Sequence, residues 1–289
     1  METFDYIIVG AGSAGSVLAS RLSEDETSTV CVLEAGPRDW HPFIHIPAGF
    51  MYTLVNPNVN WLYTSEASEW TGGRRIAAPR GKTLGGSSSI NGHIYNRGQR
   101  LDFDGWAQRG NRGWGYSDVL PYFRKSERRI GEADDTFRGR EGNLPITDLD
   151  WRDPLYEAFI EGAVEMGIPR NRDYNGTMQA GVSYVQRIIQ NGRRMSAARG
   201  YLHPAMGRRN LTVRTNAQAS EIVLEGKRAI GVRYRQGGRN GTPMEVRAAK
   251  EVILCGGTVN SPQLLQVSGI GPAPLLQAHG ITLDLVMDE

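Results

Sequence analysis

The N-terminal pattern of apolar and polar residues predicts a strand, a helix and a second strand. A continuous apolar run from Phe4 to Val9 leads directly into a glycine-rich turn, and residues including Ala14 and Leu18 then recur at helical spacing. A second apolar run, Val30 to Leu33, follows and ends in an acidic residue. The first 34 residues are therefore expected to form a βαβ unit.

The regular spacing of apolar residues is lost after this unit. Residues 36–79 contain prolines with aromatic residues between them, which predicts an ordered but irregular excursion. Residues 79–92 are rich in glycine and serine and are too polar for a core. A short helix is expected from a Ser117 cap to about Arg129, with Pro121 in its first turn.

A clearer helix is expected after Asp153. This residue has the chemistry of a helix cap, Pro154 suits a first helical position, and Gly167 is a typical stop. Leu155 and Phe159 begin an apolar spacing of four, four and three residues that extends to position 166. The segment therefore predicts an amphipathic helix.

The C-terminal third changes to short alternating segments. An antiparallel β meander is expected over residues 211–249, with strands at Leu211–Arg214, Glu221–Leu224, Gly231–Arg235 and Met244–Ala248. A further buried strand is expected at Val252–Cys255, followed by two glycines. A helix capped by Ser261 should then begin at Pro262 and stop at Gly269. The strand, glycine and helix sequence thus occurs twice, which is typical of an α/β fold.

Composition narrows the class of protein. The 289 residues suggest about two domains, and 33 Lys and Arg against 31 Asp and Glu give a net charge of only +2. No apolar run is long enough for a transmembrane helix, and the start of the chain lacks the pattern of a signal peptide, so a cytoplasmic location is expected. Cys31 and Cys255 lie in separate apolar runs, which predicts buried thiols rather than a disulfide or metal site.

Nucleic acid and metal are not expected ligands. Basic and acidic residues are mixed between Arg97 and Arg140, which favours a solvated helix face over a nucleic-acid patch. No group of His, Cys and carboxylate residues has the spacing of metal ligands.

The first glycine turn predicts a dinucleotide site. In Gly10-x-Gly12-x-x-Gly15 the glycines let the backbone approach a pyrophosphate, and the following helix stabilises its charge. Glu34, 19 residues beyond the last glycine, has the spacing of the acid that binds the adenosine ribose. Gly81-Lys82-Thr83 resembles a P-loop end, but Ile76 stands where that motif needs glycine. These patterns alone leave both NAD and FAD open.

Two longer segments carry a resemblance to a known family. Residues 79–91 and 257–271 look like the two signature segments of the glucose-methanol-choline (GMC) FAD-dependent oxidoreductases. The resemblance covers essentially the whole chain as the N-terminal half of such a protein, and is closest to choline-dehydrogenase-like members. It implies a Rossmann-like FAD-binding domain with an antiparallel β meander, formed by residues 1–150 and 205–289. Residues 151–204 would begin an α+β substrate-binding domain.

The resemblance also implies which residues hold FAD. Gly10, Gly12, Ser13, Ala14, Gly15, Glu34 and Ala35 would hold the pyrophosphate and adenosine, with Trp61 and Ala219 near the adenine. The flavin side would be formed by Arg80, Thr83, Leu84, Gly85, Gly86, Asn91, Gly92 and Ile94. Gly256, Gly257 and Thr258 would approach the ribityl chain and pyrophosphate. Some members attach FAD covalently through a histidine where Ile90 stands here, so non-covalent FAD is expected.

The resemblance implies the oxidation of an alcohol, in this family a primary alcohol, to an aldehyde by hydride transfer to flavin N5. The family's histidine base belongs to a C-terminal region beyond Glu289, so no catalytic residue is expected in this chain. His41 and His203 precede prolines as that base does, but lack its Gly-Thr continuation. His45 and His279 are expected on the surface or in loops, and His93 matches a position where the family uses no base.

Three readings of function follow. In the first, the chain works with the C-terminal half, supplied as a separate or cleaved polypeptide, to oxidise a small alcohol. In the second it is a catalytically incomplete FAD-binding fragment. In the third it resembles the hydroxynitrile lyases of the same family, which keep FAD without using its redox chemistry. An NAD dehydrogenase is the remaining alternative.

Overall fold

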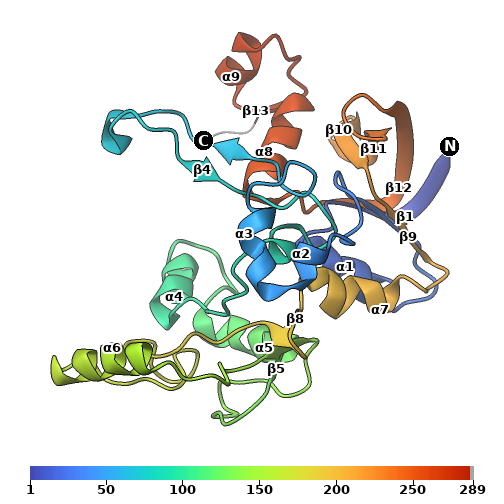
Figure 1. The fold of residues 1–289 in the computed structure, drawn as a ribbon. Coiled ribbons are helices and arrows are strands. Elements are labelled where there is room, and N and C mark those ends of the chain that lie inside the picture. Colours follow the sequence, from blue (N-terminus) through green and yellow to red (C-terminus); the bar gives the residue numbers. More distant parts are fainter. Residues whose placement is uncertain (287–289) are drawn as a thin grey trace. The chain divides into compact units, whose positions relative to one another are not determined.

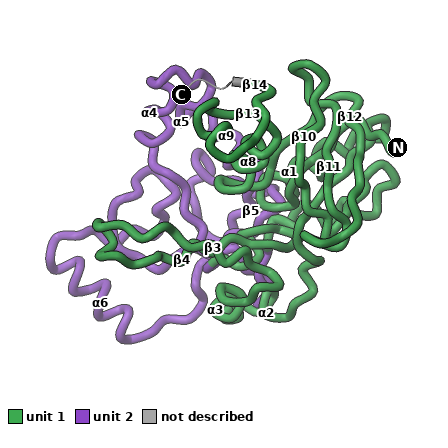
Figure 2. Tube along the Cα trace, turned by 90° about the horizontal axis from the view of Figure 1, so that it is seen from above, with its two compact units in different colours: residues 1–91, 196–289 green, residues 92–195 purple. Residues whose placement is uncertain are grey.

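The computed structural model describes residues 1–286, which form two compact units (Figure 2). The first unit comprises Met1–Asn91 and the chain from Ser196 onward, and the second comprises Gly92–Met195. The first unit is therefore assembled from two distant segments of the sequence. The functional domain boundaries expected from the sequence, at residues 150 and 205, stay a prediction.

A six-stranded mixed sheet forms the centre of the first unit, in the order β10-β11-β12-β1-β2-β9 (Figure 1). The strands β12, β1, β2 and β9 run parallel, whereas β10, β11 and β12 form an antiparallel meander. The bounds are β1 (Glu2–Val9), β2 (Val30–Leu33), β9 (Leu211–Arg214), β10 (Ala217–Glu225), β11 (Arg228–Gln236) and β12 (Thr242–Leu254). The predicted α/β class and βαβ unit are thus confirmed.

Burial on both faces explains why the central strands are continuously apolar. Alternate residues of β1 contribute to different cores: Ile7 packs with Val232 and Leu264, whereas Ile8 packs with Ala19 and Leu202. Parallel strands covered on both faces lose the alternation of apolar and polar residues. The runs Phe4–Val9 and Val30–Leu33 therefore identified the strands correctly.

The predicted meander is wrong in two places. Leu211–Arg214 forms β9, which pairs parallel with β2 at the opposite edge of the sheet from β10. The segments expected as separate strands at 244–248 and 252–255 are one strand, β12. Its first part, Thr242–Arg247, pairs antiparallel with β11, and Val246–Leu254 pairs parallel with β1. The alternation of apolar and polar residues does not encode which strand a segment pairs with. The sequence therefore could not predict the parallel pairing of β9 or the continuity of β12.

The first unit also contains helices, some of which pack on this sheet. They are α1 (Ser13–Leu22), α2 (Pro42–His45), α3 (Phe50–Thr53), α7 (His203–Ala205), α8 (Gly257–Val267) and α9 (Ala273–Ala278), with single turns η1 (Pro47–Gly49), η2 (Glu69–Thr71) and η3 (Gly86–Ser89) and the π-helix η4 (Ala198–Leu202). Of these, α1 packs on β1 and β2, and α8 packs on β10. Short strand pairs are formed by β3 (Tyr63–Thr64) with β4 (Ala77–Ala78) and by β13 (Ile270–Gly271) with β14 (Leu285–Val286). Much of the excursion from residue 36 to 79 is thus ordered into short turns.

The predicted start of α8 is wrong. The helix begins at Gly257, with Gly256 as its N-cap, and Pro262 lies inside it rather than at its first position. Gly257 has φ of +87°, a conformation that glycine adopts without strain, so the helix can begin directly after the strand. This earlier start places the helix N-terminus at the end of β12.

The second unit contains short elements. These are α4 (Arg100–Gln108), α5 (Tyr116–Ser126), α6 (Pro154–Glu165), β5 (Glu127–Arg129), β6 (Leu144–Ile146), β7 (Ile189–Gln190) and β8 (Arg193–Arg194). The predicted α6 is confirmed, because Asp153 accepts hydrogen bonds from the amides of Leu155 and Tyr156. The predicted α5 is displaced: it starts after Gly115, and the residues expected at its C-terminus form β5. No helix among residues 1–286 has the length and apolarity needed to cross a bilayer.

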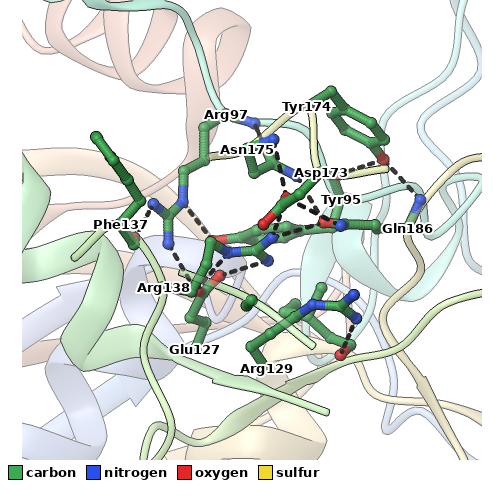
Figure 3. A network of polar contacts seen from close by, with 12 residues as sticks. Tyr95, Arg97, Glu127, Arg129, Phe137, Arg138, Asp173, Tyr174, Asn175 and Gln186 are labelled. Carbon is green, nitrogen blue, oxygen red and sulfur yellow. Dashed lines mark hydrogen bonds and ion pairs between the residues drawn. The ribbon is translucent and has the colours of Figure 1, made fainter. Parts of the chain in front are cut away.

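A buried network of charges holds the second unit together (Figure 3). Glu127 is fully buried and forms ion pairs of 2.8 Å with both Arg97 and Arg138. Arg138 also pairs with Asp173 at 2.5 Å and donates to Gln186. The expectation of a solvated helix face between residues 97 and 140 is therefore wrong for these side chains. Their charges are buried because they neutralise one another across distant segments.

Candidate functional site: a dinucleotide cavity at the ends of three strands

The first unit contains a cavity of about 1060 Å³ at the carboxyl ends of its central strands. Its lining includes the ends of β1, β2 and β12 and the residues that directly follow them, among them Gly10, Glu34 and Gly256. Ligands of open α/β sheets bind at this edge. The volume lies at the upper end of the usual range for small-molecule sites, about 300–1,000 Å³, which suits a ligand as long as a dinucleotide.

Two helix N-termini border the cavity without capping side chains. The caps of α1 and α8 are Gly12 and Gly256, neither helix has an acidic residue in its first turn, and both glycines line the cavity. Backbone N–H groups at a helix start have no partner within the helix and carry its positive dipole end. The two helices therefore offer donors to an anion, as a pyrophosphate requires.

Glycine is required at the turn that joins β1 to α1. A Cβ on Gly10 would lie 2.5 Å from the carbonyl oxygen of Cys255, and one on Gly15 would lie 1.9 Å from that of Gly10. Across the cavity wall, a Cβ on Gly86 would lie 2.8 Å from the Cα of Gly12. The predicted glycine motif thus permits close backbone contact, and the second glycine-rich segment packs directly on the first.

Glu34 presents a buried carboxylate to the cavity. The backbone amide of Ala11 donates to its Oε2 at 2.8 Å, and that of Gly36 donates to its Oε1 at 2.9 Å. Burial raises the pKa of Glu34 to about 7, against the opposing effect of these two hydrogen bonds and of Lys82. Each oxygen retains a lone pair for a further donor, so the carboxylate can accept ribose hydroxyl groups.

An aromatic wall borders another part of the cavity, formed by Trp61, which belongs to the lining, and by Tyr63, which packs on Trp61 outside the lining. Trp61 and Tyr63 stack with ring planes 6° apart, and the Lys82 ammonium lies 4.7 Å from the Trp61 ring centre. The Tyr63 hydroxyl is 2.5 Å from Oδ1 of Asn260, a cavity-lining residue of α8. Leu62, between the two aromatic residues, has φ of +54°, which is rare for a bulky side chain. The wall is therefore held by contacts that outweigh local backbone strain.

Most of the residues implied by the family resemblance share this cavity. Its lining includes Gly10, Gly12, Ser13, Ala14, Glu34, Ala35, Trp61, Arg80, Gly86, Ala219, Gly256, Gly257 and Thr258. The lining does not include Gly15, Thr83, Leu84, Gly85 or Asn91, although all belong to the first unit. Gly92 and Ile94 belong to the second unit. Direct contact of each residue with FAD stays a prediction.

The buried members outside the lining have structural contacts. Thr83 is fully buried and donates its hydroxyl to the Pro37 carbonyl, and Leu84 belongs to the core beneath α1. Gly85 has φ of +84° and packs closely on Ser89. These residues fix the course of the second glycine-rich segment, which positions the residues that do line the cavity.

Sequence reasoning missed several lining residues. Asn260 and Gln218 contribute to the cavity, as do Arg235 and Arg239 from the end of the β meander. Asn260 lies within the second signature segment, residues 257–271, so the sequence could have indicated that it lines the site. No sequence pattern indicated the two arginines, because their proximity to the cavity depends on how the strands of the meander pair.

The histidines of the first unit do not form a catalytic group in the cavity lining. His41 caps α2 by accepting from the amide of Phe43, and His203 contacts the buried Asp39 through Nε2 at 2.9 Å. Within residues 1–286, no group of three or more His, Cys, Asp or Glu side chains is arranged to hold a metal ion. Cys31 and Cys255 are both free thiols.

Fold, glycine turns and cavity together define an α/β dinucleotide-binding protein, and comparison with known proteins identifies its family. The family model described as GMC oxidoreductase matches residues 4–286, so the chain belongs to the GMC oxidoreductases. FAD is accordingly its cofactor, and the uncapped helix starts and buried carboxylate fit that dinucleotide.

Individual relatives support this assignment. The chain is 47% identical over 284 residues to an oxygen-dependent choline dehydrogenase of Staphylococcus aureus (strain MSSA476), covering 97% of this chain and 49% of that protein. The structure of pyridoxine 4-oxidase from Mesorbium loti matches with a TM-score of 0.93 and 38% identity, covering 99% of this chain and 55% of that one. An FAD-dependent oxidoreductase from Chaetomium thermophilum matches with a TM-score of 0.90 and 32% identity, covering 97% and 50%. The chain spans about half the length of the curated relatives it matches.

Tyr63→Phe is expected to speed the release of FAD. The substitution removes the hydroxyl that bonds Asn260 but keeps the ring stacked on Trp61. Loss of one hydrogen bond worth about 1 kcal/mol predicts roughly a fivefold faster dissociation. Stopped-flow measurement of flavin fluorescence after dilution tests this, with the exposed Tyr122→Phe as control. An unchanged dissociation rate would show that the aromatic wall does not retain the cofactor.

Proposed function

We propose that this chain forms the FAD-binding part of an enzyme that oxidises a primary alcohol to an aldehyde. The observation that carries the proposal is the cavity at the strand ends, which combines two uncapped helix N-termini with the buried carboxylate of Glu34. Membership of the GMC oxidoreductases places this cavity in an oxidoreductase family. Choline is the first alcohol to test, because a relative of this chain is named a choline dehydrogenase.

The residues of this chain bind and orient the cofactor. Bound FAD supplies the acceptor for the hydride that leaves the alcohol carbon. The N-termini of α1 and α8 hold the pyrophosphate, and Glu34 accepts the adenosine ribose hydroxyls. Arg80 and Gly86, which also line the cavity, lie along the flavin side of the proposed site.

A group outside residues 1–289 takes the hydroxyl proton in this proposal. Such a base needs a pKa near the working pH and hydrogen-bond reach of the alcohol, which a histidine best provides. We assign it to the family's C-terminal segment, in the same or a separate polypeptide. The hydroxynitrile lyase alternative has no specific support from the cavity.

The surface of α6 supports a contribution from further protein. Leu155, Phe159 and Met166 are 74%, 73% and 83% exposed, and they follow one another at helical spacing. Contiguous exposed apolar side chains of this kind mark an interaction surface. We propose that the remainder of the substrate-binding domain covers them.

A cytoplasmic location also stays a prediction.

Anaerobic addition of the right alcohol is expected to bleach the visible flavin absorbance when the C-terminal segment is present. Reduction of the flavin without dioxygen isolates hydride transfer from reoxidation. A panel of primary alcohols that includes choline should be compared with the corresponding carboxylic acids, which cannot donate the hydride in this way. Absence of bleaching by every alcohol would contradict the proposed oxidation, and retention of flavin would then leave the cofactor-binding reading.

FAD is expected to leave the protein on denaturation. Ile90 is 2% exposed and packs with Ile44 and Val59, and its side chain has no atom that can form a covalent link to the flavin. Acid precipitation should therefore leave free FAD in the supernatant, measured by chromatography. Flavin that stays with the precipitated polypeptide would contradict non-covalent binding.

A further inference from the structure

The cavity wall carries more positive than negative charge. Its lining contains three arginines, Arg80, Arg235 and Arg239, and one carboxylate, Glu34. Both oxygens of Glu34 already accept backbone amides, and among residues 1–286 Glu34 forms no ion pair with an arginine. The positive charges of the wall are therefore not neutralised by the acid that shares it.

These arginines differ from their neighbours in the same sheet. Arg233 pairs with Glu221 at 2.6 Å and with Glu245 at 3.1 Å. In the described part of the chain, no carboxylate oxygen lies within 4.0 Å of a side-chain nitrogen of Arg235 or Arg239. Arg235 donates weakly to the Gly241 carbonyl, at 3.4 Å. Arg235 and Arg239 thus face the cavity without an acidic partner.

The sheet register places this pair beside the proposed adenosine end of the cavity. Arg235 lies opposite Gln218 in the pairing of β10 with β11, next to Ala219. Arg239 belongs to the turn that joins β11 to β12. Both are exposed to solvent as well as to the cavity. They therefore stand where a ligand passes from solution into the site.

We infer that Arg235 and Arg239 form an electrostatic entrance that captures FAD through the negative charge of its pyrophosphate. The inference rests on the assignment of FAD to this cavity and extends it to two residues at the cavity's solvent edge. A cleft lined by one sign of charge raises the local concentration of an oppositely charged ligand and its association rate. The bound pyrophosphate is then held by the helix N-termini. The pair should accordingly act on association and leave dissociation unchanged.

The test compares FAD rebinding to the apoprotein of the wild type and of the double variant Arg235→Gln, Arg239→Gln. Quenching of flavin fluorescence in a stopped-flow instrument gives both rate constants without any turnover. At low salt the variant is expected to bind about fivefold more slowly, since steering effects of tenfold or more are typical of focused charge. In about 1 M salt, where the screening length is about 3 Å, the two association rates should converge.

A matched control removes the same charge elsewhere on the hairpin. Lys227→Gln with Arg228→Gln changes two exposed cations at the opposite end of β10 and β11, outside the cavity lining. An equal slowing in this control would assign the effect to net charge and overturn the inference. A faster dissociation with unchanged association would also overturn it. Failure of the wild type to bind FAD would overturn the cofactor assignment itself, whereas absence of alcohol bleaching with normal FAD binding would affect only the proposed reaction.

Discussion

Replacing Glu127 by glutamine is expected to lower the free energy of unfolding of the second unit by about 3–5 kcal/mol, the usual cost of removing one partner from a buried ion pair. Glu127 is fully buried and neutralises Arg97 and Arg138, and it also accepts the backbone amide of Gly139 at 2.8 Å. Glutamine keeps the shape but removes the negative charge. Two guanidinium groups are then left buried with Asp173 as the remaining acid of the network.

Hydrogen exchange provides the measurement. Amides of β5 and of residues 93–97 should exchange faster in the variant, while those of β1 should keep their protection, because they belong to the other unit. The exposed pair Glu66 and Arg75 supplies the control: Glu66→Gln should change stability by less than about 1 kcal/mol. An equally small effect of Glu127→Gln would mean that the network does not hold the unit together.

The same residue predicts an acid limit for the second unit. Burial alone would raise the pKa of Glu127, but Arg138 and Arg97 outweigh it and hold the pKa below its usual 4.5. A carboxylate with a lowered folded-state pKa contributes stability above its unfolded pKa and loses it as the pH falls through the folded value. The wild type should therefore lose protection in acid more steeply than Glu127→Gln does.

Glu34→Gln is expected to have opposite effects on the empty protein and on cofactor binding. The folded-state pKa of about 7 exceeds the usual 4.5, so ionisation disfavours the empty fold. Stability from this group is fully present below pH 4.5 and is lost as the pH rises through 7. The difference corresponds to about 3 kcal/mol at pH 8. Glutamine should remove this pH-dependent loss, but its NH2 group cannot accept the second of the two backbone amides, which costs about 1–3 kcal/mol at every pH.

FAD should nevertheless bind the Glu34→Gln variant more weakly. Hydrogen bonds to a charged acceptor are worth about 1.5–3 kcal/mol, so the dissociation constant should rise by roughly 10–100-fold. Urea unfolding of the apoprotein between pH 5 and 8 and FAD titration of the same samples test both effects. Glu225→Gln, on the exposed end of β10, is the control. A variant that binds FAD as tightly as the wild type would contradict the role of Glu34 in holding the ribose.

The sequence predicted the central strands and their ligand edge well, because local physics determines them. Phe4–Val9 and Val30–Leu33 are apolar throughout, as burial on both faces demands, and the glycines after β1 are the only residues that its close contacts allow. The sequence could not predict that Leu211–Arg214 leaves the meander to pair with β2, because alternation is the same for any partner strand.

Within the candidate site, the same distinction separates what was found from what was missed. Glu34 and the first glycine turn are linked by a fixed number of residues, so their place in one cavity could be predicted along the chain. Thr83 and Leu84 belong to a signature segment, yet they face the interior, because the side chains of an irregular segment have no period from which to read their direction. Arg235 and Arg239 reach the cavity only through the register of β10 and β11.

By itself, the sequence determined the βαβ unit, the glycine turn proposed to hold the pyrophosphate and the acidic residue beside it, since each depends on the conformation of a short continuous segment. The tertiary structure decided which distant segments meet: the joining of β12 to β1, the contact of Tyr63 with Asn260, and the burial of Glu127 between two arginines. Those contacts join distant chain segments through apolar burial and charge neutralisation. Neither effect produces a regular residue spacing that a single sequence would show.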